Sequence, residues 1–223
     1  MSEDRPIEFL PSTPPIPAPA SAGSAPAGRR DVGIVFLGAS LVAGYGDPKG
    51  QGWVTRVIGR SQHPDLDLTA YNLAIRGDTT ADVLTRWHTE VPLRWRGRAE
   101  RRLVVSVGGN DIAAGVSLAR HRLGLANLLD DATSAGVRPF VVSPPPSGSA
   151  EVNEKLEVLL QAQSDVCSRR GVPFVDCFTP LLGHDQWQSD LAAGDGHHPG
   201  QAGYGLIAWL VLHNGWPEWL GVS

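Results

Sequence analysis

The amino-acid sequence predicts an α/β domain of three layers, in which helices cover both faces of a parallel sheet. Five short apolar runs, rich in β-branched residues, recur along the chain. Continuous runs of this length are typical of strands buried on both faces of a parallel sheet. Segments with helical periodicity separate the runs, and this alternation is the pattern of an α/β domain. The length of 223 residues suits one domain with a substantial core.

The strands are expected at residues 32–37, 66–73, 103–107, 137–143 and 172–177. Four helices are expected between and after them, at residues 79–95, 118–135, 151–170 and 199–213. The first helix opens with Thr79 and Asp82, which can form a capping box. The third has its apolar side chains on one face and stops at Gly171, a residue that suits a helix end.

The N-terminal 30 residues differ in composition from the rest of the chain. They contain seven of the 18 prolines, with Ala, Ser and Gly between them. Such a segment favours extended, solvated conformations and buries little apolar surface. We therefore expect residues 1–30 to be a disordered tail or linker, or a docking peptide, and residues 31–223 to form the folded domain.

The charge and hydropathy of the chain exclude several classes of protein. The formal net charge is −4, which gives no reason to expect a nucleic acid or an anionic membrane as partner. No apolar run reaches the roughly 20 residues of a membrane-spanning helix, so stable membrane insertion is not expected. The acidic N-terminus lacks the features of a secretory signal, which favours a cytoplasmic protein. No oligomeric state is indicated.

The cysteines and arginines have plain structural interpretations. Cys167 and Cys177 are too few for a disulfide framework or a four-cysteine zinc site, although one bridge between them is possible. We expect both to be buried thiols in a reduced compartment. Five arginines near the expected third strand are expected to form a solvated basic face instead of a nucleic-acid patch; they are Arg94, Arg96, Arg98, Arg101 and Arg102.

The residues that follow the strands are the candidates for a functional site. Ligands of open α/β sheets bind at the carboxyl ends of the strands. Ser40 follows the first strand, Gly77 the second and Asn110 the third, while Asp195 and His198 precede the last helix. Small and polar residues therefore fall where this architecture places a site.

These five residues carry the groups that acyl transfer requires. A serine hydroxyl is a weak nucleophile that needs a base, usually a histidine oriented by a carboxylate. His198 lies three residues after Asp195, so one turn can bring the carboxylate to the imidazole. Ser40 stands at a strand-to-helix junction, Gly77 permits close backbone approach, and Asn110 supplies a side-chain N–H for an oxyanion.

Four sequence blocks resemble those of the SGNH (GDSL-type) hydrolases, a superfamily of serine esterases and lipases. The first block of that family reads Gly-Asp-Ser-Leu, and residues 38–41 match three of its four positions. The second contributes a glycine, matched by Gly77, and the third, Gly-x-Asn-Asp, is matched by residues 108–111. Residues 195–199 match the last, Asp-x-x-His-Pro. The blocks come in the family's order, and the resemblance covers roughly residues 32–213.

The resemblance implies a flavodoxin-like sandwich with five parallel strands that cleaves a small-molecule carboxylic ester. Ser40 would be the nucleophile, His198 the general base and then acid, and Asp195 the residue that orients the imidazole. The backbone N–H groups of Ser40 and Gly77, with the side chain of Asn110, would form the oxyanion hole. No metal or organic cofactor is implied.

One departure from the family concerns Ala39, which replaces the Asp next to the nucleophile. In the family that Asp is expected to support the local turn, so Ser40 is expected to be less firmly held here. Three functions therefore stay open. They are ester hydrolysis, acyl transfer or thioester cleavage by the same residues, and binding by an inactive domain that kept the fold.

Other kinds of site are disfavoured. The chain has no Gly-x-Ser-x-Gly elbow, no phosphate-binding loop and no Gly-x-Gly-x-x-Gly motif. A metal site would leave Ser40 and Asn110 unexplained; its ligands would be His184, Asp185, Asp195, His197 and His198. Residues 178–194 are expected to be a long loop that shapes the acyl pocket, with Trp187 either in that pocket or in the core. Residues 216–220 are expected to pack on the helices.

Overall fold

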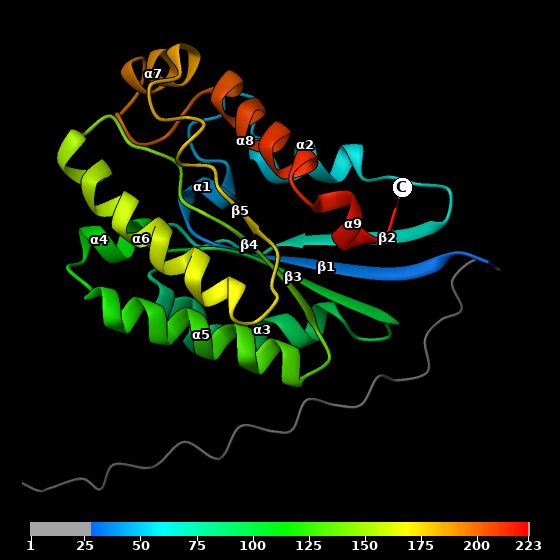
Figure 1. The fold of residues 1–223 in the computed structure, drawn as a ribbon. Coiled ribbons are helices and arrows are strands. Elements are labelled where there is room, and N and C mark those ends of the chain that lie inside the picture. Colours follow the sequence, from blue (N-terminus) through cyan, green and yellow to red (C-terminus); the bar gives the residue numbers. More distant parts are fainter. Residues whose placement is uncertain (1–27, 223) are drawn as a thin grey trace, which may run out of the picture.

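A five-stranded parallel sheet forms the centre of the fold in the computed structural model, which describes residues 28–222 (Figure 1). The strand order is β2-β1-β3-β4-β5, the flavodoxin-like order. In chain order the strands are β1 (Arg30–Gly38), β2 (Leu66–Asn72), β3 (Glu100–Ser106), β4 (Arg138–Val142) and β5 (Phe174–Val175). The predicted fold class is therefore confirmed.

Helices cover both faces of the sheet and make the domain three-layered. In chain order they are α1 (Ser40–Ala43), α2 (Gly52–Arg60), α3 (Thr80–Arg94), α4 (Gly109–Ala113), α5 (Leu118–Ser134), α6 (Ala150–Ser168), α7 (Asp185–Ala192), α8 (Gln201–His213) and α9 (Trp216–Leu220). Figure 1 shows α2, α8 and α9 above the sheet and α3 and α5 below it. The crossover helices α3 and α5 link parallel strands, as the sequence pattern predicted.

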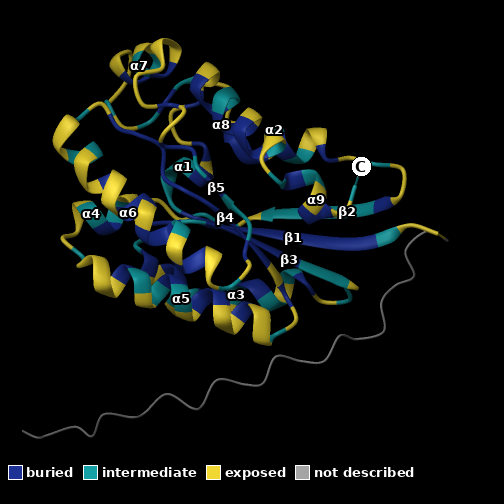
Figure 2. Ribbon diagram, in the orientation of Figure 1, coloured by how far each residue is buried: buried dark blue, intermediate teal, exposed yellow. Residues whose placement is uncertain are grey.

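The sheet is buried because each of its faces packs on a separate apolar cluster. Residues 31–38 of β1 are all buried, which explains why this strand is a continuous apolar run (Figure 2). Phe36 points into the cluster shared with α2, α8 and α9. Its neighbours Val35 and Leu37 point into the cluster shared with α3 and α5. Successive side chains of a strand face opposite sides, so one run supplies both cores.

Several elements differ from the sequence expectation. Residues 178–194 were expected to be a loop, but Asp185–Ala192 forms α7, whose N-cap is His184. Its eight residues give too short a periodic pattern to stand out in the sequence. Trp187 on this helix is fully buried and donates from Nε1 to the carbonyl of Pro146 at 3.0 Å, so it is a core residue. Helix α2 also lies outside the four predicted helices.

The expected basic face is wrong for Arg102, whose side chain is fully buried. Arg102 donates to the carbonyls of Trp219 and Leu220 at the end of α9 and pairs with Glu100 at 2.8 Å. Arg30 pairs with the same carboxylate at 2.7 Å. The hydrogen bond from Arg30, with that from Arg102, lowers the pKa of Glu100 to about 2. These contacts hold residues 216–220 against the sheet, so that Trp216 and Trp219 pack on Phe140.

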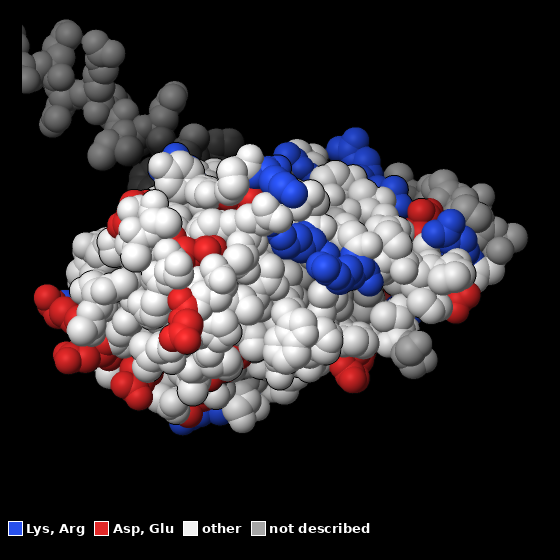
Figure 3. Space-filling view, turned by 90° about the horizontal axis from the view of Figure 1, so that it is seen from above, with Lys and Arg blue, Asp and Glu red and all other residues white. Residues whose placement is uncertain are grey.

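The cysteines are buried free thiols. Burial raises the pKa of Cys167 to about 12, as expected of an unreactive core residue. Of the predicted tail, residues 1–27 lie outside the described part of the chain, whereas Arg30 already belongs to β1. None of the helices between residues 28 and 222 is long and apolar enough to cross a membrane. On the face formed by α7, α8 and α2, acidic side chains lie mainly toward α7 and basic ones toward α2 (Figure 3).

Candidate active site

Ser40 is presented at the carboxyl end of β1 by a tight strand-to-helix turn. β1 ends at Gly38, where a Cβ atom would collide with the carbonyl of Ser106 and the side chain of Val42. Ser40 is the first residue of the one-turn helix α1, which ends at Gly44 in the left-handed region (φ 78°). Ala39 occupies the N-cap position and supplies no side-chain hydrogen bond. The turn therefore forms without the Asp that the family carries there.

A continuous chain of short contacts joins Ser40, His198 and Asp195. His198 Nε2 lies 2.7 Å from Ser40 Oγ, although 158 positions separate the two residues. His198 Nδ1 lies 2.7 Å from Asp195 Oδ2. With Nδ1–H donating to the carboxylate, Nε2 presents a lone pair to the serine hydroxyl. The structure thus brings together the three residues that the sequence assigned to nucleophile, base and orienting carboxylate.

Asp195 is held as an anion by donors from its own turn. Its Oδ1 accepts hydrogen bonds from the backbone N–H groups of His197 and His198, each at 2.9 Å. Partial desolvation acts to raise its pKa, but these bonds and that from the His198 ring outweigh it. The pKa of Asp195 is consequently far below its usual value. The ionised carboxylate is therefore an acceptor for the Nδ1–H group of His198.

Residues beyond the predicted set position the imidazole. The ring of Tyr45 meets the ring of His198 edge-on, with centroids 4.8 Å apart. The Tyr45 carbonyl accepts a 2.6 Å hydrogen bond from the buried hydroxyl of Tyr204 on α8. Gly46 (φ 91°) packs against His198, where a Cβ atom would approach that residue's Cβ to 3.3 Å. Tyr45 lies only five positions after Ser40, but nothing in the sequence predicts its contact with His198.

A cavity of about 50 Å³ lies beside Ser40. Asp78, Gly109, Asn110 and Pro144 line it with Ala39 and Ser40. The Asn110 carboxamide lies at this cavity and donates to the carbonyl of Asp78 at 2.9 Å, which ties α4 to the loop after β2. Gly77, with φ 89°, precedes Asp78 in that loop, but it is not among the lining residues. Within residues 28–222, the backbone N–H groups of Ser40 and Gly77 donate to no backbone carbonyl.

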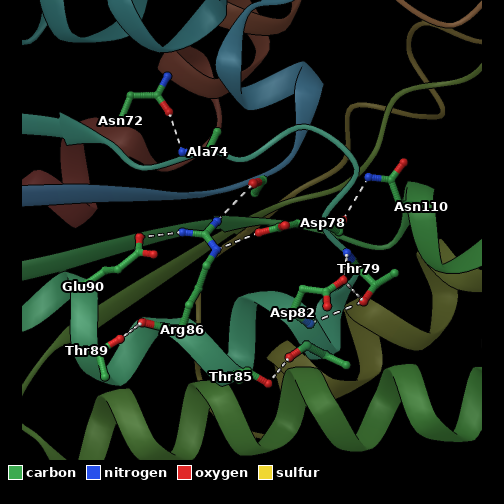
Figure 4. Close-up of polar contacts among 12 residues, drawn as sticks. Asn72, Ala74, Asp78, Thr79, Asp82, Thr85, Arg86, Thr89, Glu90 and Asn110 are labelled. Carbon is green, nitrogen blue, oxygen red and sulfur yellow. Dashed lines mark hydrogen bonds and ion pairs between the residues drawn. The ribbon is translucent and has the colours of Figure 1, made fainter.

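Arg86 on α3 holds the loop that carries Gly77 and Asp78. It donates from Nε to Asp78 at 2.6 Å and from Nη1 to Glu90 at 3.0 Å, and Nη2 lies 3.5 Å from the carbonyl of Gly38 at the end of β1 (Figure 4). The predicted capping box of Thr79 and Asp82 is present and fixes the other end of the loop. Arg86 could not be predicted as part of the site, because nothing in the sequence of α3 shows which loop its side chain contacts.

A buried polar network lies behind Asn110. Its neighbour Asp111 accepts hydrogen bonds from the backbone and hydroxyl of Thr80, at 2.8 and 2.7 Å. His121 Nδ1 lies 2.6 Å from the same carboxylate, and Gln163 Nε2 lies 3.2 Å from His121 Nε2. All four side chains are at most 2% exposed. Burial opposes ionisation of Asp111, but the bonds from His121 and Thr80 keep its pKa below its usual value.

The residues proposed above as alternative metal ligands do not converge. His184 caps the N-terminus of α7 and Asp185 begins that helix, whereas Asp195 and His198 pair with each other. In the described part of the chain, no three His, Cys, Asp or Glu side chains are arranged to hold a metal ion.

Comparison with known proteins identifies the family. The model of the GDSL-like lipase/acylhydrolase family matches residues 36–206, which include all five site residues. The chain belongs to the GDSL-like lipase/acylhydrolase family. The predicted resemblance to SGNH hydrolases is therefore confirmed, and with it an enzyme of the ester hydrolase class.

The relatives agree with this family. Esterase TesA of Pseudomonas aeruginosa is 26% identical over 187 residues, covering 82% of this chain and 86% of that protein. A crystal structure of TesA has a TM-score of 0.67 at 22% identity, covering 83% of this chain and 98% of that one. A mutant of Axe2, an acetylxylan esterase from Geobacillus stearothermophilus, has a TM-score of 0.66 at 17% identity over 92% of this chain and 98% of its own. These structural similarities show that this chain, TesA and Axe2 have the same fold.

Proposed function

We propose that this GDSL-family enzyme cleaves carboxylic esters through an acyl-enzyme on Ser40. One observation carries the proposal: the unbroken Asp195–His198–Ser40 chain, whose two contacts are both 2.7 Å. A serine at hydrogen-bond distance from an imidazole, which a carboxylate orients, is the arrangement that activates a hydroxyl for acyl transfer.

In the proposed mechanism, His198 Nε2 takes the proton from Ser40 as Oγ attacks the ester carbonyl carbon. The negative charge that develops on the carbonyl oxygen is stabilised by the N–H groups of Ser40 and Gly77 and by the Asn110 carboxamide. His198 then gives the proton to the departing alcohol oxygen as the C–O bond breaks. Water, deprotonated by the same imidazole, releases the acid and restores Ser40.

Hydrolysis is favoured over acyl transfer by the openness of the site. The side chain of Asp195 is 49% exposed and that of His198 is 19% exposed, so water can reach the acyl-enzyme. The relatives, Esterase TesA and the acetylxylan esterase Axe2, are named for ester hydrolysis. We therefore propose an ester of small-molecule size as substrate.

The predicted cytoplasmic location and the predicted Pro-rich tail stay predictions.

The test combines covalent labelling with turnover of p-nitrophenyl esters of graded chain length. A fluorophosphonate probe should label the wild-type protein and fail to label Ser40→Ala, and Ser40→Ala should lose ester turnover by several orders of magnitude. Ser134→Ala, at the exposed end of α5 and away from the cavity, is the matched control and should keep both properties. Full esterase activity in a folded Ser40→Ala protein would overturn the proposal. Product analysis with an added alcohol would reveal acyl transfer.

A further inference from the structure

Arg76 stands beside the proposed active site in an unusual setting for a cation. It belongs to the loop after β2 and is exposed. Its guanidinium carbon lies 3.5 Å from the ring centroid of Tyr45, so the two groups are stacked. The Tyr45 ring in turn meets the ring of His198 edge-on. Arg76, Tyr45 and His198 therefore form a continuous row of contacts that ends at the imidazole next to Ser40.

The positive charge of Arg76 has no anionic partner among residues 28–222, where no carboxylate lies within 4.0 Å of it. The carboxylates of the surrounding elements are already engaged. Asp78, two positions along the same loop, pairs with Arg86 at 2.6 Å. Asp47, after Tyr45, pairs with Arg56 at 2.5 Å, and Asp195 pairs with His198. The Tyr45 ring orients the guanidinium while leaving its N–H donors free.

We infer that Arg76 is a specificity-determining residue that recognises an anionic group on the leaving-group side of the substrate. This inference rests on the proposed ester hydrolysis at Ser40. The substrate class is an ester whose alcohol portion carries a carboxylate or a phosphate. A guanidinium presents N–H donors in a planar fork that matches either anion.

The leaving-group side follows from the chemistry at His198. The departing oxygen must receive its proton from His198 Nε2, so the alcohol portion leaves past this imidazole. The ring of Tyr45 contacts that imidazole, and Arg76 covers the ring. The cavity beside Asn110 is lined instead by residues of α4, Pro144 and Asp78, and neither Tyr45 nor Arg76 nor His198 is among its lining residues.

Electrostatics supplies a second reason for an anion in the substrate. His198 becomes positively charged in the transition state, and a neighbouring cation disfavours that charge. An anion bound to Arg76 offsets this repulsion while the imidazolium is present. The interaction therefore acts on the transition state as well as on binding, and it should appear in kcat/KM.

The experiment compares matched phenyl acetates that differ in one ring substituent. The anionic substrates are 3-carboxyphenyl acetate and 3-phosphonophenyl acetate, and the neutral match is 3-carbamoylphenyl acetate. The wild-type enzyme should prefer an anionic ester by roughly 3- to 10-fold in kcat/KM, the range of a partly exposed charge-assisted contact. The two anions show whether Arg76 favours carboxylate or phosphate. Added salt should weaken the preference, because it screens exposed charges.

Three variants make the comparison decisive. Arg76→Gln should reduce the anionic-to-neutral ratio to about 1, and Arg76→Glu should reverse it. Arg138→Gln, which replaces an exposed arginine at the amino end of β4, should keep the wild-type ratio. The measured quantity is the ratio of kcat/KM for the anionic and neutral esters within one protein. A general loss of activity, or a smaller folded fraction, lowers both values equally and leaves the ratio unchanged.

The outcomes separate this inference from the proposed function. An unchanged ratio in Arg76→Gln, with turnover still dependent on Ser40, would overturn the role of Arg76 alone. A wild-type enzyme without any preference for the anionic esters would do the same. Turnover that survives in Ser40→Ala would overturn the proposed function first.

Discussion

Asp195 and His198 at the surface, and Asp111 and His121 in the interior, form two carboxylate–imidazole pairs of nearly the same length. The Nδ1–Oδ2 distance is 2.7 Å in the first pair and 2.6 Å in the second. A hydroxyl belongs to each pair, Ser40 to the first and Thr80 to the second. The difference lies in which atom the hydroxyl meets. Ser40 contacts Nε2, the nitrogen that faces away from the carboxylate, whereas Thr80 donates to the carboxylate and lies 3.1 Å from Nδ1, the nitrogen already paired with it.

The second imidazole nitrogen explains why the interior pair is structural. His121 Nε2 faces the amide of Gln163, which also donates to the carbonyl of Val107 at 2.9 Å. Nε2 of His121 therefore faces an amide instead of a hydroxyl, and the Thr80 hydroxyl lies 3.1 Å from Nδ1, the nitrogen that already pairs with Asp111. The interior pair instead joins α3, α4, α5 and α6 behind Asn110. Gly108 (φ 111°) makes room for it, since a Cβ atom there would come within 3.0 Å of His121. An Asp–His pair thus indicates a general base only where a reactive group contacts the imidazole nitrogen that faces away from the carboxylate.

The largest effect expected from this comparison is a loss of activity without a loss of stability. His198→Ala should lower kcat by roughly 10³- to 10⁶-fold, since the triad acts as a unit. Its melting temperature should stay near that of the wild type, because the side chain is at the surface. Steady-state kinetics and thermal unfolding measure the two quantities. A His198→Ala protein with wild-type kcat would contradict the functional side of the comparison.

Replacing the surface carboxylate by its amide should be the next largest change. Asp195→Asn should lower kcat by roughly 10²- to 10⁴-fold, because the imidazole loses its orientation and the anion that stabilises its charge. The free energy of unfolding should change little, as the side chain is half exposed. Kinetics on Asp190→Asn, which alters a nearby carboxylate without contacting His198, provides a control for general perturbation of this loop.

Replacing the carboxylate of the interior pair should reduce stability more than activity. Asp111→Ala removes the carboxylate that accepts from both donors of Thr80 and pairs with His121, and leaves Thr80 Oγ1 only its 3.1 Å contact with His121 Nδ1. It should therefore lower the free energy of unfolding by about 3–5 kcal/mol. Urea denaturation measures this loss. Any effect on kcat should be smaller than that of His198→Ala. A stable Asp111→Ala protein with strongly reduced kcat would instead assign the interior pair a role in catalysis.

A smaller effect is expected from the partner of the buried imidazole. Gln163→Leu removes the donor to Val107 and to His121, and it should cost about 1–2 kcal/mol of unfolding free energy. The loss is limited because the Gln163 carbonyl oxygen, which lacks a protein partner, is removed as well. Comparison of urea midpoints with Gln161→Leu, on the exposed side of α6, isolates the buried contribution.

The ionised carboxylate of the interior pair should also make the free energy of unfolding depend on pH. The pKa of Asp111 in the folded protein lies below the ordinary value of 3.8, so the unfolded chain binds more protons in acid. The stabilising contribution is therefore complete above that value and is lost as pH falls through the folded pKa. Asp111→Asn should flatten this part of the stability curve, measured by urea unfolding between neutral and acidic pH. If the stability of Asp111→Asn depends on pH as steeply as that of the wild type, the interior pair does not contain an ionised Asp111.

The alternation of apolar runs and helical segments was enough to predict the parallel sheet and the layers. A strand that is buried on both faces is a continuous apolar run, and such a run can be recognised from neighbouring residues alone. The site residues could be predicted for a related reason. Ser40, Gly77 and Asn110 each follow a strand, and carboxyl ends of parallel strands meet at one edge. Their blocks also matched a family pattern. Helix α7 was missed because it is short, and the burial of Arg102 because its partners are carbonyls from the end of the chain.

Sequence alone therefore determined the fold class, the family and the identity of the candidate nucleophile, base and carboxylate. Only the tertiary structure decided how the remaining polar groups are paired: Arg86 with the Gly77 loop, Asp111 with His121, and Arg76 with Tyr45. The physical reason is that hydrophobic periodicity depends on a few neighbouring residues. A hydrogen bond or a stacked ring depends instead on where folding places two segments that lie far apart along the chain.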